Sequence, residues 1–382
     1  MNDTETFFSR QRALGELDLD RLRASSAMVV GLGNVGGPAA LELARAGVGR
    51  LVLIDRDEVA PENASRGIFC AHDAGMPKAI AAATRIADLV PGVDIVPLVA
   101  DVRTEVPDTQ FSGCDALLIA TDSWSSRMHA NRWAHALPGN TKVVVTGGLS
   151  GLSWEVTSSV PASGRGCSQC PHGAAVAGHD EEGGCGVAGR GSERRIDPSA
   201  SFTGAMVAST MVMEGCAALG GDGPRFAGRM LSFEYGAGRY TLMELTPDED
   251  CTGHARLIEG HDFVVVPHCD TPGALAACVE RLKGWDDRQI ALTAELDIVR
   301  ARTCRACGCR DEIFRALVNF RADNATCACG AADFDYDVGT EVIDREGAFR
   351  AQGVPDGKAV IAHWRDRSII VIRRERPHEL DQ

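Results

Sequence analysis

The amino-acid sequence predicts an α/β protein: a doubly wound parallel sheet with helices on both faces, followed by a small C-terminal α+β domain. Between about residues 28 and 150, short apolar runs alternate with segments of helical periodicity, the pattern of β-α-β units. Beyond about residue 260 the alternation stops, and closely spaced cysteines appear among short strand-like runs. We therefore divide the chain into an N-terminal arm and helix (1–27), a main domain (28–260) and a small domain (261–382).

The expected elements follow from the apolar patterns in chain order. Runs rich in Val, Ile and Leu predict strands at Met28–Val30, Arg50–Ile54, Asp94–Leu98, Ala116–Ala120 and Lys142–Thr146. Helical patterns lie between them at Pro38–Ala46, Pro77–Leu89 and Ser126–His135. A further helix is expected in the small domain at Pro272–Lys283.

The composition is that of a soluble globular protein, with 45% apolar and 24% charged residues. A net charge of −14 argues against a chain built to coat nucleic acid. The polar N-terminus has no leader pattern, and no apolar run reaches the length expected of a membrane span, so we expect a cytoplasmic protein without membrane contact. In a reducing location, the 14 cysteines are expected to be metal ligands, nucleophiles or core residues rather than disulfides.

A glycine-rich turn follows the first expected strand, with Gly31, Gly33 and Gly36 spaced as G-x-G-x-x-G. Such a turn presents backbone N–H groups and a helix start to phosphate. With Asp55 ending the second strand, it also matches the fingerprint of an NAD-dependent oxidoreductase. That alternative leaves a series of polar residues unexplained, namely Asp57, Asn63, Arg66, Lys78, Asp122, Arg127 and Asn131. They belong at the carboxyl ends of neighbouring strands, where an open α/β sheet binds its ligand.

ATP accounts for this series better than a nicotinamide cofactor does. Asp55 is suited to the ribose, Arg66 and Lys78 to the triphosphate, and Asp122 to Mg²⁺, which prefers oxygen ligands. Attack of a carboxylate on the α-phosphate builds negative charge between two anions. Cationic groups that surround the phosphates therefore supply most of the catalysis. A general base is not required, because a carboxylate nucleophile is already ionised.

Two cysteine groups predict zinc. Cys167 and Cys170 form C-x-x-C, and Cys251 with His254 forms C-x-x-H at the far end of the main domain. Together they make the Cys₃His set of a structural zinc site, whereas a single C-x-x-C would also suit redox chemistry.

The second group lies in "TCRACGC" and "TCACG" of the small domain and predicts a zinc ribbon. Five thiols compete there for four places. The preferred ligands are Cys304, Cys307, Cys327 and Cys329, which leaves Cys309 spare.

The combined motifs resemble those of the E1-like ThiF/MoeB/HesA adenylyltransferases. The matching text is "FSRQ", "VVGLGNVGGPAALELARAGVGRLVLIDRDEVAPENASR", "GMPKAIAAATRIADLVPGVDI", "DALLIATDSWSSRMHAN" and "CSQC…CTGH", over about residues 7–256. The resemblance implies a Rossmann-like, usually homodimeric enzyme that uses ATP to adenylate the C-terminal carboxylate of a ubiquitin-like or sulfur-carrier protein or of a peptide, releasing pyrophosphate.

The resemblance also implies roles for single residues. It assigns Gly33 and Gly36 to the glycine loop, Asp55 to the ribose, Asn63, Arg66 and Lys78 to the phosphates, and Asp122 to the metal. Arg10, in the "SRQ" arm, would reach the ATP of the neighbouring subunit. Cys185 would receive the activated product as a thio-adduct, as a loop cysteine does in sulfur-transferring relatives; a plain loop cysteine is the alternative.

Other functions stay open on the sequence alone. Within the family, the acceptor could be a small peptide or a tRNA-linked carboxylate, although the zinc pair and the acidic balance argue against tRNA. Outside it, the alternatives are the oxidoreductase and a scaffold that keeps the fold without catalysis. The charged residues predicted to bind Mg·ATP, namely Arg66, Lys78 and Asp122, argue against both.

Overall fold

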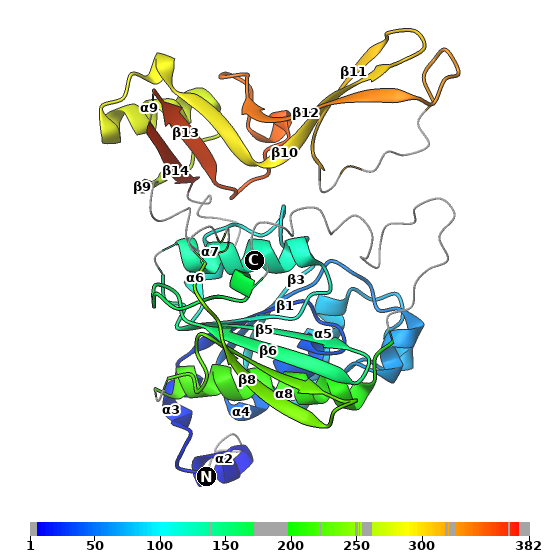
Figure 1. Ribbon diagram of the computed structural model, residues 1–382, viewed down its shortest axis with the longest axis vertical. Coiled ribbons are helices and arrows are strands. Elements are labelled where there is room, and N and C mark those ends of the chain that lie inside the picture. The colour runs from blue at the N-terminus through cyan, green and yellow to red at the C-terminus, as the bar shows by residue number, and fades with distance from the viewer. Residues whose placement is uncertain are drawn as a thin grey trace. The chain divides into compact units, whose positions relative to one another are not determined.

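The computed structural model describes residues 6–137, 139–171, 198–221, 223–248, 251, 253, 262–317, 320, 326–365 and 367–373. The chain divides into two compact units (Figure 1). The first comprises Met1–Arg103 with Gln110–Leu257, and the second Thr104–Thr109 with Ile258–Gln382. The short segment Thr104–Thr109 falls within the predicted main domain, but in the structure it packs with the second unit.

The elements of the first unit agree with the sequence patterns. Its helices are α2 (Ser9–Arg12), α3 (Leu19–Arg23), α4 (Gly36–Ala46), α5 (Lys78–Leu89), α6 (Gln110–Gly113), α7 (Trp124–Ala136) and α8 (Ser201–Gly220). Its strands are β1 (Ser26–Val30), β2 (Arg50–Ile54), β3 (Asp94–Leu98), β4 (Ala116–Ile119), β5 (Val143–Ser150), β6 (Ser153–Ser159), β7 (Arg229–Glu234) and β8 (Arg239–Glu244). The predicted strands and helices between residues 28 and 146 are confirmed, with small shifts at their ends.

The sheet is mixed: the five predicted strands pair in parallel as expected, whereas three further strands correct the prediction of a parallel sheet. Its strand order is β3-β2-β1-β4-β5-β6-β7-β8. Strands β1 to β5 pair in parallel, whereas β6, β7 and β8 continue the sheet in antiparallel pairs. Gly151 and Leu152 alone join β5 to β6, and Gly151 has a φ of 59°. So short a connection can only reverse the chain, because a parallel partner needs a long crossover.

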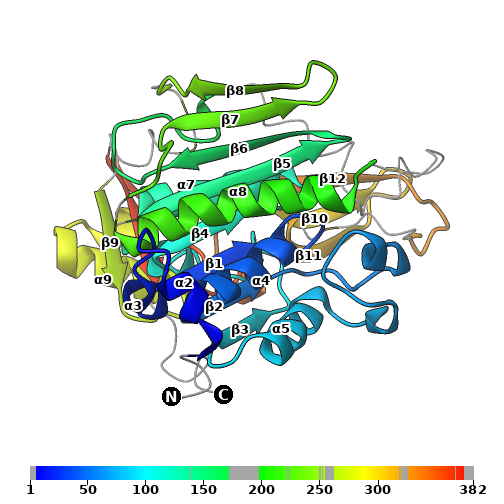
Figure 2. The same ribbon diagram turned by 90° about the horizontal axis from the view of Figure 1, so that it is seen from below.

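Helices cover both faces of this sheet (Figure 2). Helix α4 packs against α8 and β1 on one face, and α7 packs against β4 and β5 on the other. The central strands are apolar throughout because both of their faces are covered. Val29, Leu53, Leu118 and Val145 are fully buried in the resulting core.

Helix α8 is long and apolar enough, by length and composition, to cross a membrane. This differs from the sequence expectation that no segment passes such a test. However, 61% of its most apolar window is buried in the protein, and it packs against α4 and β5. We therefore describe α8 as a core helix of the first unit.

The second unit is built on a six-stranded sheet with one long helix among its described residues. The strands are β9 (Asp262–Val266), β10 (Ala291–Cys304), β11 (Arg310–Ala316), β12 (Phe334–Val342), β13 (Val360–Trp364) and β14 (Arg367–Arg373), and the helix is α9 (Pro272–Lys283). The order is β11-β10-β13-β14-β9, and β12 also pairs with β10. Helix α9 has the predicted bounds, begins with Pro272 and is capped by the Thr271 side chain, which accepts a hydrogen bond from the Ala274 N–H.

Candidate active site and cysteine clusters

The candidate nucleotide site lies where the strand order of the first sheet reverses, between β1 and β4. The glycine turn follows β1, and Ala120–Ser123 follows β4. Gly31 has a φ of 85°, and a Cβ there would lie 2.8 Å from the Ala120 carbonyl oxygen. Glycine at this position therefore lets the two loops meet at the carboxyl edge of the sheet.

The Asp55 carboxylate lies beside the glycine turn, at the position where an open α/β sheet has its ligand-binding crevice. It accepts hydrogen bonds from the Leu32 N–H at 2.7 Å and from the Asp57 N–H at 2.9 Å, and so ties the end of β2 to the glycine turn. Burial raises the pKa of Asp55 above its ordinary value, while the Lys78 ammonium acts to lower it.

Lys78 interacts with several of the predicted polar residues. Its Nζ lies 3.0 Å from Oδ2 of Asp57, and the side chain is only 12% exposed. Burial acts to lower the pKa of Lys78, but the charges of Asp55, Asp57 and Asp122 outweigh it and raise that pKa above its ordinary value. A single ammonium therefore lies within the field of three carboxylates from two separate loops.

Asn63 and Arg66 lie in the loop between β2 and α5. The Asn63 side-chain oxygen accepts a hydrogen bond from the Ala60 N–H at 2.9 Å and so caps the 3-10 turn Pro61–Ser65. Arg66 Nη1 donates to Oγ of Ser199, 2.8 Å away, just before α8. In this structure Arg66 thus binds a neutral hydroxyl, a partner that a phosphate oxygen can replace with a stronger, charge-assisted bond.

Helix α7 separates two residues that the sequence placed together. Arg127 donates to the Thr121 carbonyl at 2.6 Å, beside Asp122; burial lowers the pKa of this arginine against the opposing charges of Glu155 and Asp122. Asn131 instead is fully buried, and its Nδ2 lies 3.5 Å from Sγ of Cys167. Asn131 thus lies one helical turn after Arg127, where its amide contacts the cysteine cluster, and its ATP-binding role stays a prediction.

Arg10 lies near the C-terminal end of α4, whereas the glycine turn lies at the start of that helix. It is an exposed residue of α2. The next residue, Gln11, donates a hydrogen bond to the Arg45 carbonyl at the end of α4. The glycine turn precedes the start of α4, and 11 helical residues span about 16 Å. Within one chain Arg10 is therefore remote from the crevice, so its predicted role requires a second copy of the chain.

Three charged residues that were not predicted from the sequence lie at the same carboxyl edge: Arg56, Asp101 and Arg103. Arg56 Nη1 donates to Oδ2 of Asp101 at 2.7 Å, and Arg103 Nη2 donates to the same oxygen at 2.9 Å. The available signal was an acidic residue shortly after the third strand, at the edge where the other predicted residues lie.

The first cysteine cluster brings together Cys167, Cys170 and Cys251. The sulfur of Cys167 lies 3.8 Å from that of Cys251 and 3.9 Å from that of Cys170. A tetrahedral zinc ion with bonds of about 2.3 Å keeps its sulfur ligands about 3.8 Å apart, so this geometry fits zinc. The fourth predicted ligand, His254, and the predicted nucleophile, Cys185, lie outside the described residues.

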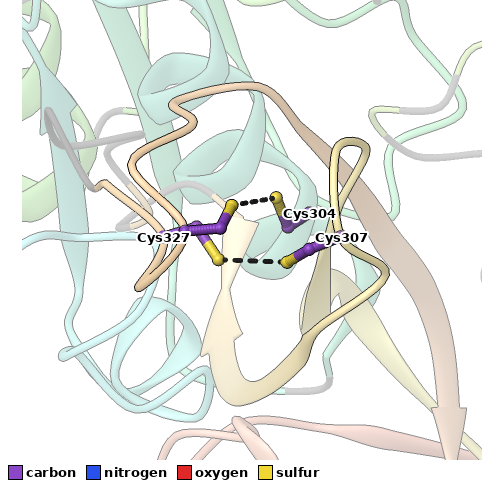
Figure 3. A group of neighbouring side chains, drawn as sticks. Cys304, Cys307 and Cys327 are labelled. Carbon is purple, nitrogen blue, oxygen red and sulfur yellow. Dashed lines mark hydrogen bonds between the residues drawn. The ribbon is translucent and has the colours of Figure 1, made fainter.

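The second cluster brings together the four preferred ligands of the second unit, and Figure 3 shows Cys304, Cys307 and Cys327 facing one another. Sγ of Cys304 lies 3.7 Å from that of Cys329, and Sγ of Cys307 lies 3.5 Å from that of Cys327. Cys304 ends β10 and Cys307 lies in the following turn, whereas the other two precede β12. The spacing fits a tetrahedral zinc site.

A third group, Cys70, His72 and Asp73, also has the residue types of a metal site. Here Arg85 Nη2 lies 2.7 Å from Sγ of Cys70 and 3.4 Å from Oδ2 of Asp73. A guanidinium already occupies the position between the two potential ligands, so charge repulsion disfavours a metal ion there.

Metal analysis tests the two clusters. After dialysis, the wild-type chain is expected to retain about two zinc ions, since each cluster offers the ligand chemistry of one structural site. The Cys327→Ser variant should lose about one of them, whereas Cys309→Ser should lose none. Elemental mass spectrometry gives the ratio, and loss of zinc in Cys309→Ser would show that the ligand choice is wrong.

The comparisons with known proteins concern mainly the first unit. The model of the ThiF family matches residues 8–253. The chain is 34% identical over 175 residues to the sulfur carrier protein ThiS adenylyltransferase of Escherichia coli (strain K12), covering 44% of this chain and 68% of that protein. It is 38% identical over 112 residues to the SAMP-activating enzyme E1 of Haloferax volcanii, covering 29% of this chain and 42% of that protein.

Solved structures agree with this fold. The structure of E. coli MccB with succinimide has a TM-score of 0.53 and 14% sequence identity, covering 65% of this chain and 74% of that one. The chain spans about two thirds of the first curated relative and less than half of the second. Most of the second unit, from Ile258 onward, lies beyond the family match.

Proposed function

The chain belongs to the ThiF family and is an E1-like adenylyltransferase, and on this premise we propose that it adenylates the C-terminal carboxylate of a ubiquitin-like or sulfur-carrier protein. The observation that carries the proposal is the grouping of charged side chains at this site. At the carboxyl edge of a doubly wound sheet, Lys78 pairs with Asp57 and lies in the field of Asp55 and Asp122. Asp55 in turn binds the glycine turn. This is the position at which such a sheet binds nucleotides.

The reaction follows from the charges in the crevice. A carboxylate oxygen of the acceptor attacks the α-phosphorus of ATP, a new P–O bond forms, and the bond to the β-phosphate breaks to release pyrophosphate. Lys78 and Arg66 offset the charge that develops on the phosphates, and the backbone N–H groups of the glycine turn hold them in place. Asp122 supplies the carboxylate for Mg²⁺, which would neutralise the triphosphate when bound.

The names of the relatives support the acceptor class. One similar protein acts on the sulfur carrier protein ThiS, and another activates SAMP proteins. The proposal extends to three further points from the sequence. Residues 28–260 form the adenylation domain. The enzyme acts as a homodimer, in which Arg10 reaches the site of the neighbouring subunit, and Cys185 receives the activated product. The small domain at 261–382 is assigned no step of the reaction.

Nucleotide binding is tested by thermal unfolding with Mg·ATP, with NAD⁺ and without ligand. A ligand at about 100 times its Kd adds about 2.7 kcal/mol to the free energy of unfolding, so Mg·ATP should raise the Tm by a few degrees. We expect no shift with NAD⁺. Stabilisation by NAD⁺ alone would contradict the proposed site.

The acceptor class is tested by ATP–pyrophosphate exchange with ThiS as the probe. Exchange is expected with ThiS but not with ThiS truncated at its C-terminus, since the terminal carboxylate is the nucleophile. Bulk tRNA serves as the competing acceptor. Exchange with tRNA and not with ThiS would overturn the assignment of a protein acceptor.

A further inference from the structure

Asp101 is a buried carboxylate that binds two arginines at the ligand-binding edge of the first sheet. It follows β3 and is only 5% exposed. Arg103 donates to both of its oxygens, from Nε at 3.1 Å and from Nη2 at 2.9 Å, and Arg56 donates from Nη1 at 2.7 Å. Burial acts to raise the pKa of Asp101, but these hydrogen bonds and charges lower it to about 2, so the group is a carboxylate at neutral pH.

Arg103 connects this carboxylate to the loop that carries Asp122. Its Nη1 donates to Oγ of Ser125 at 2.9 Å, and that hydroxyl lies 3.1 Å from Oγ of Ser123. Ser123 is the N-cap of α7, and its hydroxyl accepts a hydrogen bond from the Ser126 N–H. Asp122 immediately precedes this cap, so the hydrogen-bonded chain from Asp101 ends at its neighbouring residue.

Arg56 connects the same carboxylate to the end of β2. Its guanidinium is half exposed, lies 2.7 Å from Asp101 and has its Nε 3.8 Å from Oδ1 of Asp57. Burial acts to lower the pKa of Arg56, but the charges of Asp101, Asp57 and Asp122 raise it. Asp101 thus holds the Arg56 guanidinium within the field of Asp57 and Asp122. Arg56 is therefore a second cation near these carboxylates, besides Lys78.

We propose that Asp101 is a positioning residue for magnesium–nucleotide binding, which acts through Arg103 on the Asp122 loop and through Arg56 on Asp57. The proposal rests on the proposed function of the crevice. A magnesium–nucleotide site built from separate loops needs those loops held in register before the ion binds, because Mg²⁺ tolerates little deviation from octahedral geometry. One buried anion that binds a cation from each side supplies that register.

The sharpest variant is Ser125→Ala, because it cuts the link between Arg103 and the Asp122 loop without touching the buried ion pair. Binding of a fluorescent ATP analogue is measured at increasing free Mg²⁺. The variant loses both hydrogen bonds of the Ser125 hydroxyl, to Arg103 and to Ser123. This loss is expected to raise the Mg²⁺ concentration for half-maximal binding about three- to tenfold, with little change in Tm. Ser125→Thr keeps a hydroxyl and should restore the wild-type value.

Asp101→Asn extends the test to the carboxylate itself. It removes the charge that holds both arginines, so it should raise the Mg²⁺ requirement at least as much as Ser125→Ala does. The matched control is Asp94→Asn, since Asp94 pairs with Arg50 at 2.9 Å across the same two strands, β2 and β3, but at their other ends. The control should leave the Mg²⁺ dependence unchanged.

A double-mutant cycle separates positioning from a structural role. In an Asp122→Asn background, Ser125→Ala should have little further effect on the Mg²⁺ requirement, because the residue that it positions is already lost. A lower Tm with wild-type Mg²⁺ dependence in both Ser125→Ala and Asp101→Asn would overturn the positioning role alone. Failure of the wild-type protein to bind Mg·ATP would instead overturn the proposed function and, with it, the basis of this inference.

Discussion

Replacing Lys78 with methionine is expected to lower the rate of ATP–pyrophosphate exchange about 10²- to 10³-fold, the usual effect of removing one group that stabilises developing charge. The Lys78 ammonium lies 3.0 Å from Asp57 and near Asp55 and Asp122. Methionine keeps most of the length of the side chain but leaves three carboxylates and an incoming triphosphate without this cation. The fall should be larger in kcat than in the affinity for ATP, because charge builds up in the transition state.

The matched control for this experiment is Lys142→Met. Lys142 also forms a lysine–aspartate pair, with Asp115 at 3.4 Å, but at the amino ends of β4 and β5. Its removal should leave the exchange rate within about twofold, since exposed pairs contribute little. If Lys78→Met kept more than about a third of the wild-type rate, the assignment of the crevice as the adenylation site would fail.

Lys358→Met is expected to lower the free energy of unfolding of the second unit by about 3–5 kcal/mol, the cost of removing one partner from a buried ion pair. Lys358 Nζ lies 2.8 Å from Oδ1 of Asp108, and the two side chains are 3% and 1% exposed. Oδ2 of Asp108 accepts a hydrogen bond from the Ala359 N–H at 2.8 Å. The pair therefore fixes Thr104–Thr109 to the strand β13 that follows Lys358.

Urea unfolding followed by hydrogen exchange in β13 and β14 peptides measures this loss in the second unit directly. The double variant Asp108→Leu with Lys358→Met should recover much of it, because replacing a buried pair with apolar groups is often close to neutral. Asp356→Asn is the control, since its pair with Arg350 is exposed and its N–O distance is 3.6 Å. A loss below about 1 kcal/mol in Lys358→Met would contradict the account of Asp108.

Local sequence patterns were sufficient for the elements of the first unit. The strand β2 has the predicted bounds, because an apolar run between polar residues is a strong signal for a buried parallel strand. The half-buried edge strand β3 has its predicted bounds as well. The direction of β6 was not predicted, since it depends on a two-residue turn at Gly151 rather than on any periodicity. For the same reason the antiparallel extension of the parallel sheet by β6, β7 and β8 was not predicted.

The candidate site was only partly accessible from the sequence. The glycine turn, Asp55 and Lys78 could be proposed because each follows or begins a predictable element. Asn131 shows the limit of this reasoning: it lies one turn after Arg127 on α7, yet its amide contacts the cysteine cluster. Spacing on a helix gives the shared face of two residues, but not which neighbour each of them meets.

The sequence by itself determined the alternation of strands and helices, the glycine turn, the cysteine groups and the family resemblance, because these depend on residues close together in the chain. Only the tertiary structure decided which distant residues form one site. Lys78 and Asp122 lie near each other because β1 and β4 are adjacent in the sheet, and Asp101 binds Arg56 because β2 and β3 are paired. Contacts across a sheet follow from strand order, which no local pattern encodes.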